Sequence, residues 1–152
     1  VPMGAVGVRE NIYKNLMENH KDTVEFFHGY TYSGHPLACA AALATLDVYA
    51  EEQLFDRSKH IEKLFNNSAH SLRRLDKVVD IRSLGLVAGI ELMERKKSPS
   101  TLGRDVFVEC FNRGVMVRTT GNTIAVSPPL IVNESQIEQI FDTIAKAIKV
   151  VY

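Results

Sequence analysis

One loop of the sequence combines the residue types that bind an anionic group. The stretch 28–36 reads His-Gly-Tyr-Thr-Tyr-Ser-Gly-His-Pro. Glycine lets the backbone approach a ligand, hydroxyls donate hydrogen bonds, and a helix starting at Pro36 would add unpaired N–H groups and a favourable dipole. The loop has no Lys or Arg, so neutral donors would have to bind the anion. The same residues also fit a tight aromatic loop that only caps a helix, and their chemistry alone leaves both interpretations open.

The same region holds three residues of the kinds that bind zinc. His35 and Cys39 are four apart, so they would share one face of a helix, and His28 lies just before them. No carboxylate completes the set nearby. Histidines beside glycines serve more often as structural hydrogen-bonding partners, so the sequence predicts no metal site.

Arg118 is a second candidate for ligand binding. It ends the alternating segment Val115–Arg118, shortly before a Gly121-Asn122 turn. A guanidinium suits a carboxylate ligand, because its planar fork meets both oxygens at once. On these residues alone, the simpler interpretation is a surface charge at the end of a hairpin.

The apolar patterning predicts the elements that must position these residues. Proline suits the first turn of a helix, glycine often ends one, and an Asn with Gln three residues later resembles a capping box. The expected elements, in chain order, are a buried strand at Met3–Val8, a short helix at 11–18, an Ala-rich helix from Pro36 to Tyr49, a long helix from about Glu51 to Leu75, strands at 78–81 and 86–92, a helix at 101–112, a hairpin at 115–126 and a final helix after Asn133.

The bulk composition excludes several classes of protein. The 152 residues carry a formal net charge of +0, so neither a nucleic acid nor an anionic membrane is an expected partner. No apolar run approaches the roughly 20 residues of a membrane span. The cysteines, Cys39 and Cys110, lie in apolar helical contexts and indicate reduced thiols in a cytoplasmic protein. The order of elements predicts an α/β or α+β module.

Several motifs, taken in order, resemble class III aminotransferases, the group that contains ω-amino acid–pyruvate transaminases. The resemblance covers nearly the whole chain, and agreement of several ordered motifs is more specific than any one of them. The matching segments are Pro-Met-Gly-Ala-Val at 2–6, the loop and helix start at 28–41, Gly-Leu-Val-Ala-Gly-Ile-Glu-Leu at 85–92, Gly-Val-Met-Val-Arg at 114–118, Gly-Asn at 121–122 and Ser-Pro-Pro-Leu at 127–130.

The resemblance implies a fold-type I enzyme that binds pyridoxal 5'-phosphate and works as a homodimer. Residues 1–57 would be a remnant of the large cofactor-binding domain, and 58–152 would be the small carboxy-terminal domain. Thr31 would bind the cofactor phosphate of the neighbouring subunit, with Tyr30 and Gly29 beside it. Arg118 would bind the carboxylate of the substrate. The reaction implied moves an amino group from an ω-amino acid or amine to a 2-oxo acid such as pyruvate.

The sequence departs from the family pattern in three places. Asn122 replaces a frequent Asp, a change expected to alter ion pairing around Arg118, and Ser83 replaces a common glycine. The Schiff-base lysine of the family precedes the Pro-Met-Gly-Ala motif, and this sequence begins at Val1, so no catalytic residue is assigned. We expect the isolated chain to be inactive. A start inside an apolar strand favours a truncated enzyme, and the alternative is a stand-alone domain for dimerisation or phosphate-ligand binding.

Overall fold

The computed structural model describes residues 1–18, 29–95 and 101–151, which fall into two compact units, Val1–Glu52 and Gln53–Tyr152. The expectation for His28 lies outside the described residues. The assignment of 1–57 to one domain and 58–152 to another stays a prediction about the longer enzyme.

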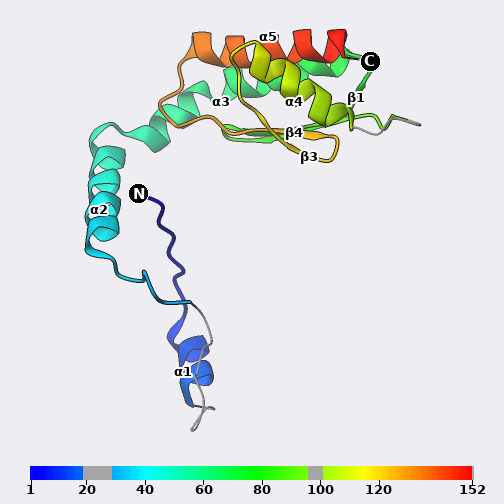
Figure 1. The fold of residues 1–152 in the computed structure, drawn as a ribbon. Coiled ribbons are helices and arrows are strands. Elements are labelled where there is room, and N and C mark those ends of the chain that lie inside the picture. The colour runs from blue at the N-terminus through cyan, green and yellow to red at the C-terminus, as the bar shows by residue number, and fades with distance from the viewer. Residues whose placement is uncertain (19–28, 96–100, 152) are drawn as a thin grey trace. The chain divides into compact units, whose positions relative to one another are not determined.

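The first unit contains two helices, α1 (Glu10–Glu18) and α2 (Pro36–Glu51) (Figure 1). None of its described residues is buried. The prediction of a buried strand at Met3–Val8 is wrong, since this segment has no strand pairing and its side chains are exposed. A strand forms only when a neighbouring strand accepts its backbone hydrogen bonds, and the described part of this unit supplies none.

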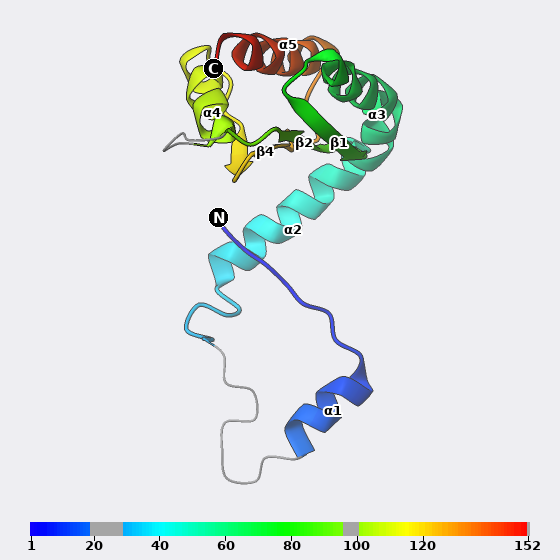
Figure 2. The ribbon, with the colours of Figure 1, turned by 90° about the vertical axis from the view of Figure 1, so that its right-hand side faces the viewer.

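The second unit is an antiparallel sheet with helices on one face (Figures 1 and 2). The strand order is β1-β2-β4-β3, which is an α+β arrangement and confirms the predicted fold class. The elements are α3 (Leu54–Ser71), the 3-10 turn η1 (Leu72–Arg74), β1 (Val78–Leu84), β2 (Val87–Leu92), α4 (Leu102–Asn112), β3 (Arg118–Thr120), β4 (Thr123–Val126) and α5 (Glu134–Val150).

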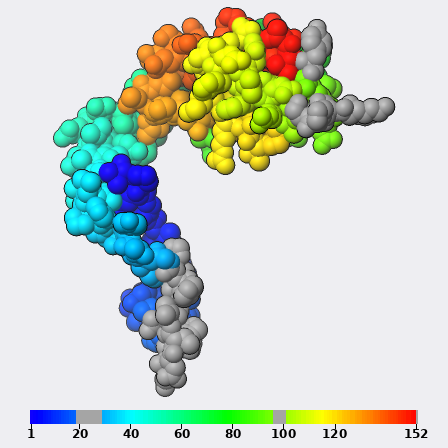
Figure 3. All heavy atoms as spheres, viewed as in Figure 1, coloured from blue at the N-terminus to red at the C-terminus, as the bar shows by residue number. Residues whose placement is uncertain are grey.

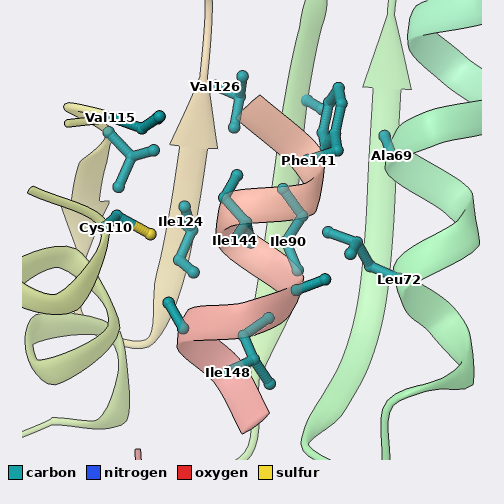
Figure 4. Close-up of a cluster of buried hydrophobic side chains, with 14 of the residues drawn as sticks. Ala69, Leu72, Ile90, Cys110, Val115, Ile124, Val126, Phe141, Ile144 and Ile148 are labelled. Atoms are coloured by element: carbon teal, nitrogen blue, oxygen red, sulfur yellow. The ribbon is translucent and has the colours of Figure 1, made fainter. Parts of the chain in front are cut away.

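The core lies between the sheet and the helices (Figure 4). Strand alternation places Ile90 of β2 and Ile124 of β4 on the helix-facing side, where both are fully buried. Ile144 of α5 is fully buried too, and Phe65 of α3 meets Phe141 of α5 edge to face, with ring centroids 5.1 Å apart. Each such side chain contributes about 1.5–3 kcal/mol through removal of apolar surface from water. This core therefore holds one face of the sheet against the helices and leaves the residues of the other face outside the core.

The helix caps follow the sequence pattern. Asn133 accepts a hydrogen bond from the Gln136 amide at 2.9 Å, and the Gln136 side chain accepts from the Asn133 amide at 3.0 Å, so the predicted capping box is confirmed. Thr101 caps α4 by accepting from the Arg104 amide at 3.2 Å. These bonds satisfy N–H groups that have no partner inside a helix.

The helix predicted from about Glu51 is present, and it begins at Leu54. The chain leaves α2 at Glu51, Gln53 adopts a left-handed conformation with φ 49, and α3 begins at Leu54. A left-handed residue cannot continue a right-handed helix, and helices commonly end with such a residue, usually glycine. No glycine stands at this position to mark the break.

We expect Gln53→Gly to stabilise the chain by about 1 kcal/mol, because the left-handed region costs an L-residue about 1–2 kcal/mol and costs glycine little. Urea unfolding monitored by circular dichroism measures the change. Gln53→Ala is the matched control and should gain nothing, since alanine keeps the Cβ atom. A lower midpoint for Gln53→Gly than for the unchanged chain would contradict the assignment of strain to this residue.

Candidate functional site

A cavity of about 1040 Å³ lies beside the hairpin of the second unit. Its walls come from α4, β3, β4, the loop 127–133 and the start of α5. In the space-filling view, the yellow atoms around the hairpin adjoin the orange atoms that lead into α5 (Figure 3). The lining includes apolar and polar side chains, among them Phe107, Met116, Arg118, Ile131 and Gln136.

Arg118 is the cationic residue of this lining. It is the first residue of β3 and pairs in register with Ala125 of β4, which pairs in turn with Gly89 of β2. Paired residues project from the same face of a sheet, so Arg118 lies on the face opposite the buried Ile124. Ala125, the small residue paired with Arg118, lines the same cavity.

A second arginine on this face shows what sets Arg118 apart. Arg82 pairs in register with Gly89, and its Nη1 lies 2.9 Å from Glu91 and 2.8 Å from Asp80. These two hydrogen bonds raise the pKa of Arg82 above its usual value, and the bond to Glu91 has the larger effect. Arg118 forms no ion pair with any described residue. Its guanidinium is therefore available to a carboxylate from outside the chain.

Asn122 makes its hydrogen bonds with α4 and β2, and the expected change in ion pairing around Arg118 stays a prediction. Its Oδ1 accepts a hydrogen bond from the Gly103 amide at 3.3 Å, and its carbonyl accepts from the Leu92 amide at 3.0 Å. The side chain thus faces the first turn of α4 and supplies a second cap there. Ser83, the other departure, contacts His70 through its Oγ at 3.0 Å from Nε2. Both residues connect elements of the fold and neither lines the cavity.

The predicted anion loop forms a tight turn ahead of α2. The Ser33 amide donates to the Tyr30 carbonyl at 3.0 Å, and the His35 amide donates to the Tyr32 carbonyl at 3.3 Å. Gly34 has a φ of 67, a conformation that glycine adopts without steric cost. His35 occupies the N-cap position without a side-chain bond to the helix. The turn therefore brings Gly29, Tyr30 and Thr31 together at the amino terminus of α2, and all three are exposed.

The donors of this turn fit a phosphate group. Among the described residues, neither the hydroxyl nor the amide of Thr31 makes a hydrogen bond, so both remain for a ligand. The start of α2 adds amides that have no partner within the helix. Thr31 belongs to the first unit and Arg118 to the second.

The described residues form neither a cluster of metal ligands nor a membrane-spanning helix. Within residues 1–18, 29–95 and 101–151, no three side chains of His, Cys, Asp or Glu group together as metal ligands would. In the same ranges, no helix is both long and apolar enough to cross a membrane. Phe107 and Ile131 also line the cavity, and the sequence did not predict this role. Their apolar side chains look the same in the sequence as those of core residues.

Relatives of known name match nearly the whole chain. An omega-aminotransferase of Caulobacter vibrioides is 47% identical over 148 residues, covering 97% of this chain and 34% of that protein. A beta-alanine–pyruvate aminotransferase of Pseudomonas aeruginosa is 35% identical over 150 residues, covering 97% of this chain and 34% of that protein. The chain therefore spans about a third of the length of these relatives.

Solved structures of the same kind share the fold. Adenosylmethionine-8-amino-7-oxononanoate aminotransferase from Methanocaldococcus jannaschii matches with a TM-score of 0.75 at 34% identity, over 83% of this chain and 30% of that one. A thermostable omega transaminase from Pseudomonas jessenii matches with a TM-score of 0.75 at 32% identity, over 82% and 29%. The model of the family described as Aminotransferase class-III matches residues 1–148. The chain thus belongs to the class III aminotransferases, a family of pyridoxal-phosphate-dependent enzymes.

Proposed function

We propose that this chain is the carboxy-terminal part of a transaminase that moves an amino group from an ω-amino acid or amine to a 2-oxo acid such as pyruvate. The observation that carries this proposal is the position of Arg118. Its guanidinium lies on the wall of a cavity of about 1040 Å³ and has no ion-pair partner among the described residues. Planar, bidentate binding of a carboxylate is what a guanidinium does best. The names of the omega-aminotransferase and beta-alanine–pyruvate aminotransferase relatives support the substrate class.

The turn at Gly29–Thr31 is proposed to bind the phosphate of pyridoxal 5'-phosphate. The Thr31 hydroxyl and amide would donate hydrogen bonds, and Tyr30 and Gly29 would lie beside the phosphate. In a homodimer, this turn would serve the cofactor of the neighbouring subunit, so each active site would need both chains. When bound, the cofactor supplies a ring that accepts electron density from the bond that breaks at the amine carbon.

The remaining residues of the site would come from the preceding part of the enzyme. No lysine stands in residues 1–9, beside the Pro-Met-Gly-Ala motif, so the lysine that carries the cofactor is proposed to precede Val1. α2 supports a place in a larger domain, because Leu37, Leu43 and Leu46 are all more than half exposed. A helix that is apolar on all sides is usually buried in a core.

We place the enzyme in the cytoplasm. Cys39 and Cys110 are free thiols, which fits a reducing compartment. Burial raises the pKa of the Cys110 thiol to about 11, so this side chain stays protonated and unreactive at neutral pH.

The test of the proposed function is transamination by the full-length enzyme that contains this chain. Purified enzyme with pyridoxal 5'-phosphate, β-alanine and pyruvate should form L-alanine, measured by chromatography. A panel of amines without a carboxylate, supplied with pyruvate, then defines the donor range. Failure of every amine and ω-amino acid to yield alanine from pyruvate would overturn the assignment.

We expect Thr31→Ala in the full-length enzyme to weaken cofactor binding by roughly tenfold or more, because a hydrogen bond to a charged group contributes about 1.5–3 kcal/mol. Titration of the cofactor-free enzyme, followed by the absorbance of bound cofactor, gives the dissociation constant. Thr45→Ala is the matched control, since the Thr45 hydroxyl bonds, within the described part of the chain, to the Ala41 carbonyl of its own helix alone, at 2.8 Å. Equal dissociation constants for Thr31→Ala and the unchanged enzyme would remove Thr31 from the phosphate site.

A further inference from the structure

Arg57 connects two parts of the second unit that are far apart in the sequence. It lies in the first turn of α3, and its Nη1 donates to the Leu130 carbonyl at 2.8 Å and to the Val132 carbonyl at 2.7 Å. The partners lie 73 and 75 positions further along the chain. The side chain is half-buried, and bonds from a charged donor are about twice as strong as neutral ones. Arg57 therefore fixes two peptide groups of the loop 127–133.

That loop is a wall of the cavity that holds Arg118. Pro128, Pro129 and Ile131 line the cavity, and Val132 lines it too. Prolines have no amide hydrogen, so the loop has few backbone hydrogen bonds available to it. Within it, the Val132 amide donates to the Pro129 carbonyl at 3.0 Å. The bonds from Arg57 thus add two anchors to the backbone bond that the loop makes within itself.

We infer that Arg57 is a positioning residue for substrate carboxylates, a role that rests on the proposed function of Arg118. While Arg57 holds the Leu130 and Val132 carbonyls, these oxygens point at Arg57. Without it, the peptide groups are free to turn, and a carbonyl oxygen that turns into the cavity carries partial negative charge. Such an oxygen repels an incoming carboxylate and competes with it for the Arg118 guanidinium.

The test compares Michaelis constants in the full-length enzyme carrying Arg57→Met. We expect the KM for a 2-oxo acid to rise about tenfold, and kcat to stay within about twofold of that of the unchanged enzyme. This is the pattern expected when a mutation removes binding energy that the ground state and the transition state share. The KM for an amine without a carboxylate should stay the same. Arg57→Lys should restore part of the affinity, because an ammonium also donates to carbonyl oxygens.

The control is Arg104→Met, which removes an exposed arginine of α4 that makes no side-chain bond with the described residues, and its KM should not change. A purely structural role for Arg57 predicts instead a lower kcat for every substrate at constant KM, and that result would overturn the inference. If Arg57→Met does not fold, Arg57→Lys is measured in its place, and its KM for the 2-oxo acid is expected to rise about threefold. Arg118→Met, measured in the same assay, separates the two claims. If Arg118→Met raises the KM for the 2-oxo acid and both Arg57 variants leave it unchanged, only the inference about Arg57 is refuted. If Arg118→Met leaves that KM unchanged, the carboxylate-binding role of Arg118 is itself refuted.

Discussion

In the full-length enzyme, Arg118→Met is expected to raise the KM for 2-oxo acids roughly 30- to 100-fold, which corresponds to loss of about 2–3 kcal/mol from a charged hydrogen-bonded pair. The reason is that Arg118 is the guanidinium on the cavity wall that has no carboxylate partner among the described residues. The KM of amines without a carboxylate should be little changed. Steady-state kinetics with pyruvate varied, at a saturating concentration of such an amine, measures the effect.

Arg82→Met is the matched control for this prediction. Arg82 lies on the same face of the sheet, but Asp80 and Glu91 already neutralise it. Its replacement should leave the KM for pyruvate unchanged. Arg118→Lys should fall between the unchanged enzyme and Arg118→Met, because an ammonium keeps the charge and loses the planar fork. Equal rises in KM for Arg82→Met and Arg118→Met would indicate a general electrostatic effect and would refute specific binding at Arg118.

Gly103→Ala is expected to destabilise the chain by about 2–3 kcal/mol, at the upper end of the costs of overpacking. A Cβ atom on Gly103 would lie 2.5 Å from the Gly121 carbonyl oxygen and 3.1 Å from the Asn122 Cα. Both atoms belong to the backbone, so no side chain can rotate to make room. Separation of α4 from the hairpin would also weaken the bond from the Gly103 amide to Asn122, 3.3 Å long.

Urea unfolding of the purified chain measures this loss as a lower midpoint. Gly89→Ala is the matched control, because its Cβ would meet Thr123 Cγ2 at 3.6 Å, an ordinary van der Waals contact. The stability of Gly89→Ala should differ from that of the unchanged chain by no more than about 0.5–1 kcal/mol, because alanine avoids the conformational entropy cost that glycine has within a strand. An unfolding midpoint for Gly103→Ala equal to that of the unchanged chain would show that α4 and the hairpin are not packed as closely as the structure has them.

The local features of this fold were readable in the sequence. The helix start at Pro36, the capping box of Asn133 and Gln136, and the turn at Gly121 were all predicted and are confirmed. Such signals are local because a cap or a turn is decided by residues within about four positions of one another. The strand at Met3–Val8 was wrong for the opposite reason, since a strand needs a neighbouring strand to bond to, and the described residues of the first unit supply none.

Ordered motifs such as Gly29–Thr31 and Val115–Arg118 were enough to identify the family and the residues that could bind ligands, because such motifs can be read in the linear chain. Which of those residues are available to a ligand could be seen only in the folded chain. Arg82 bonds to Asp80 of its own strand and to Glu91 of the neighbouring strand, Arg118 has no ion-pair partner among the described residues, and Asn122 bonds to Gly103 of α4. Contacts such as those of Glu91 and Gly103 act over a few ångströms in space, between residues that are distant in the sequence and that folding brings together.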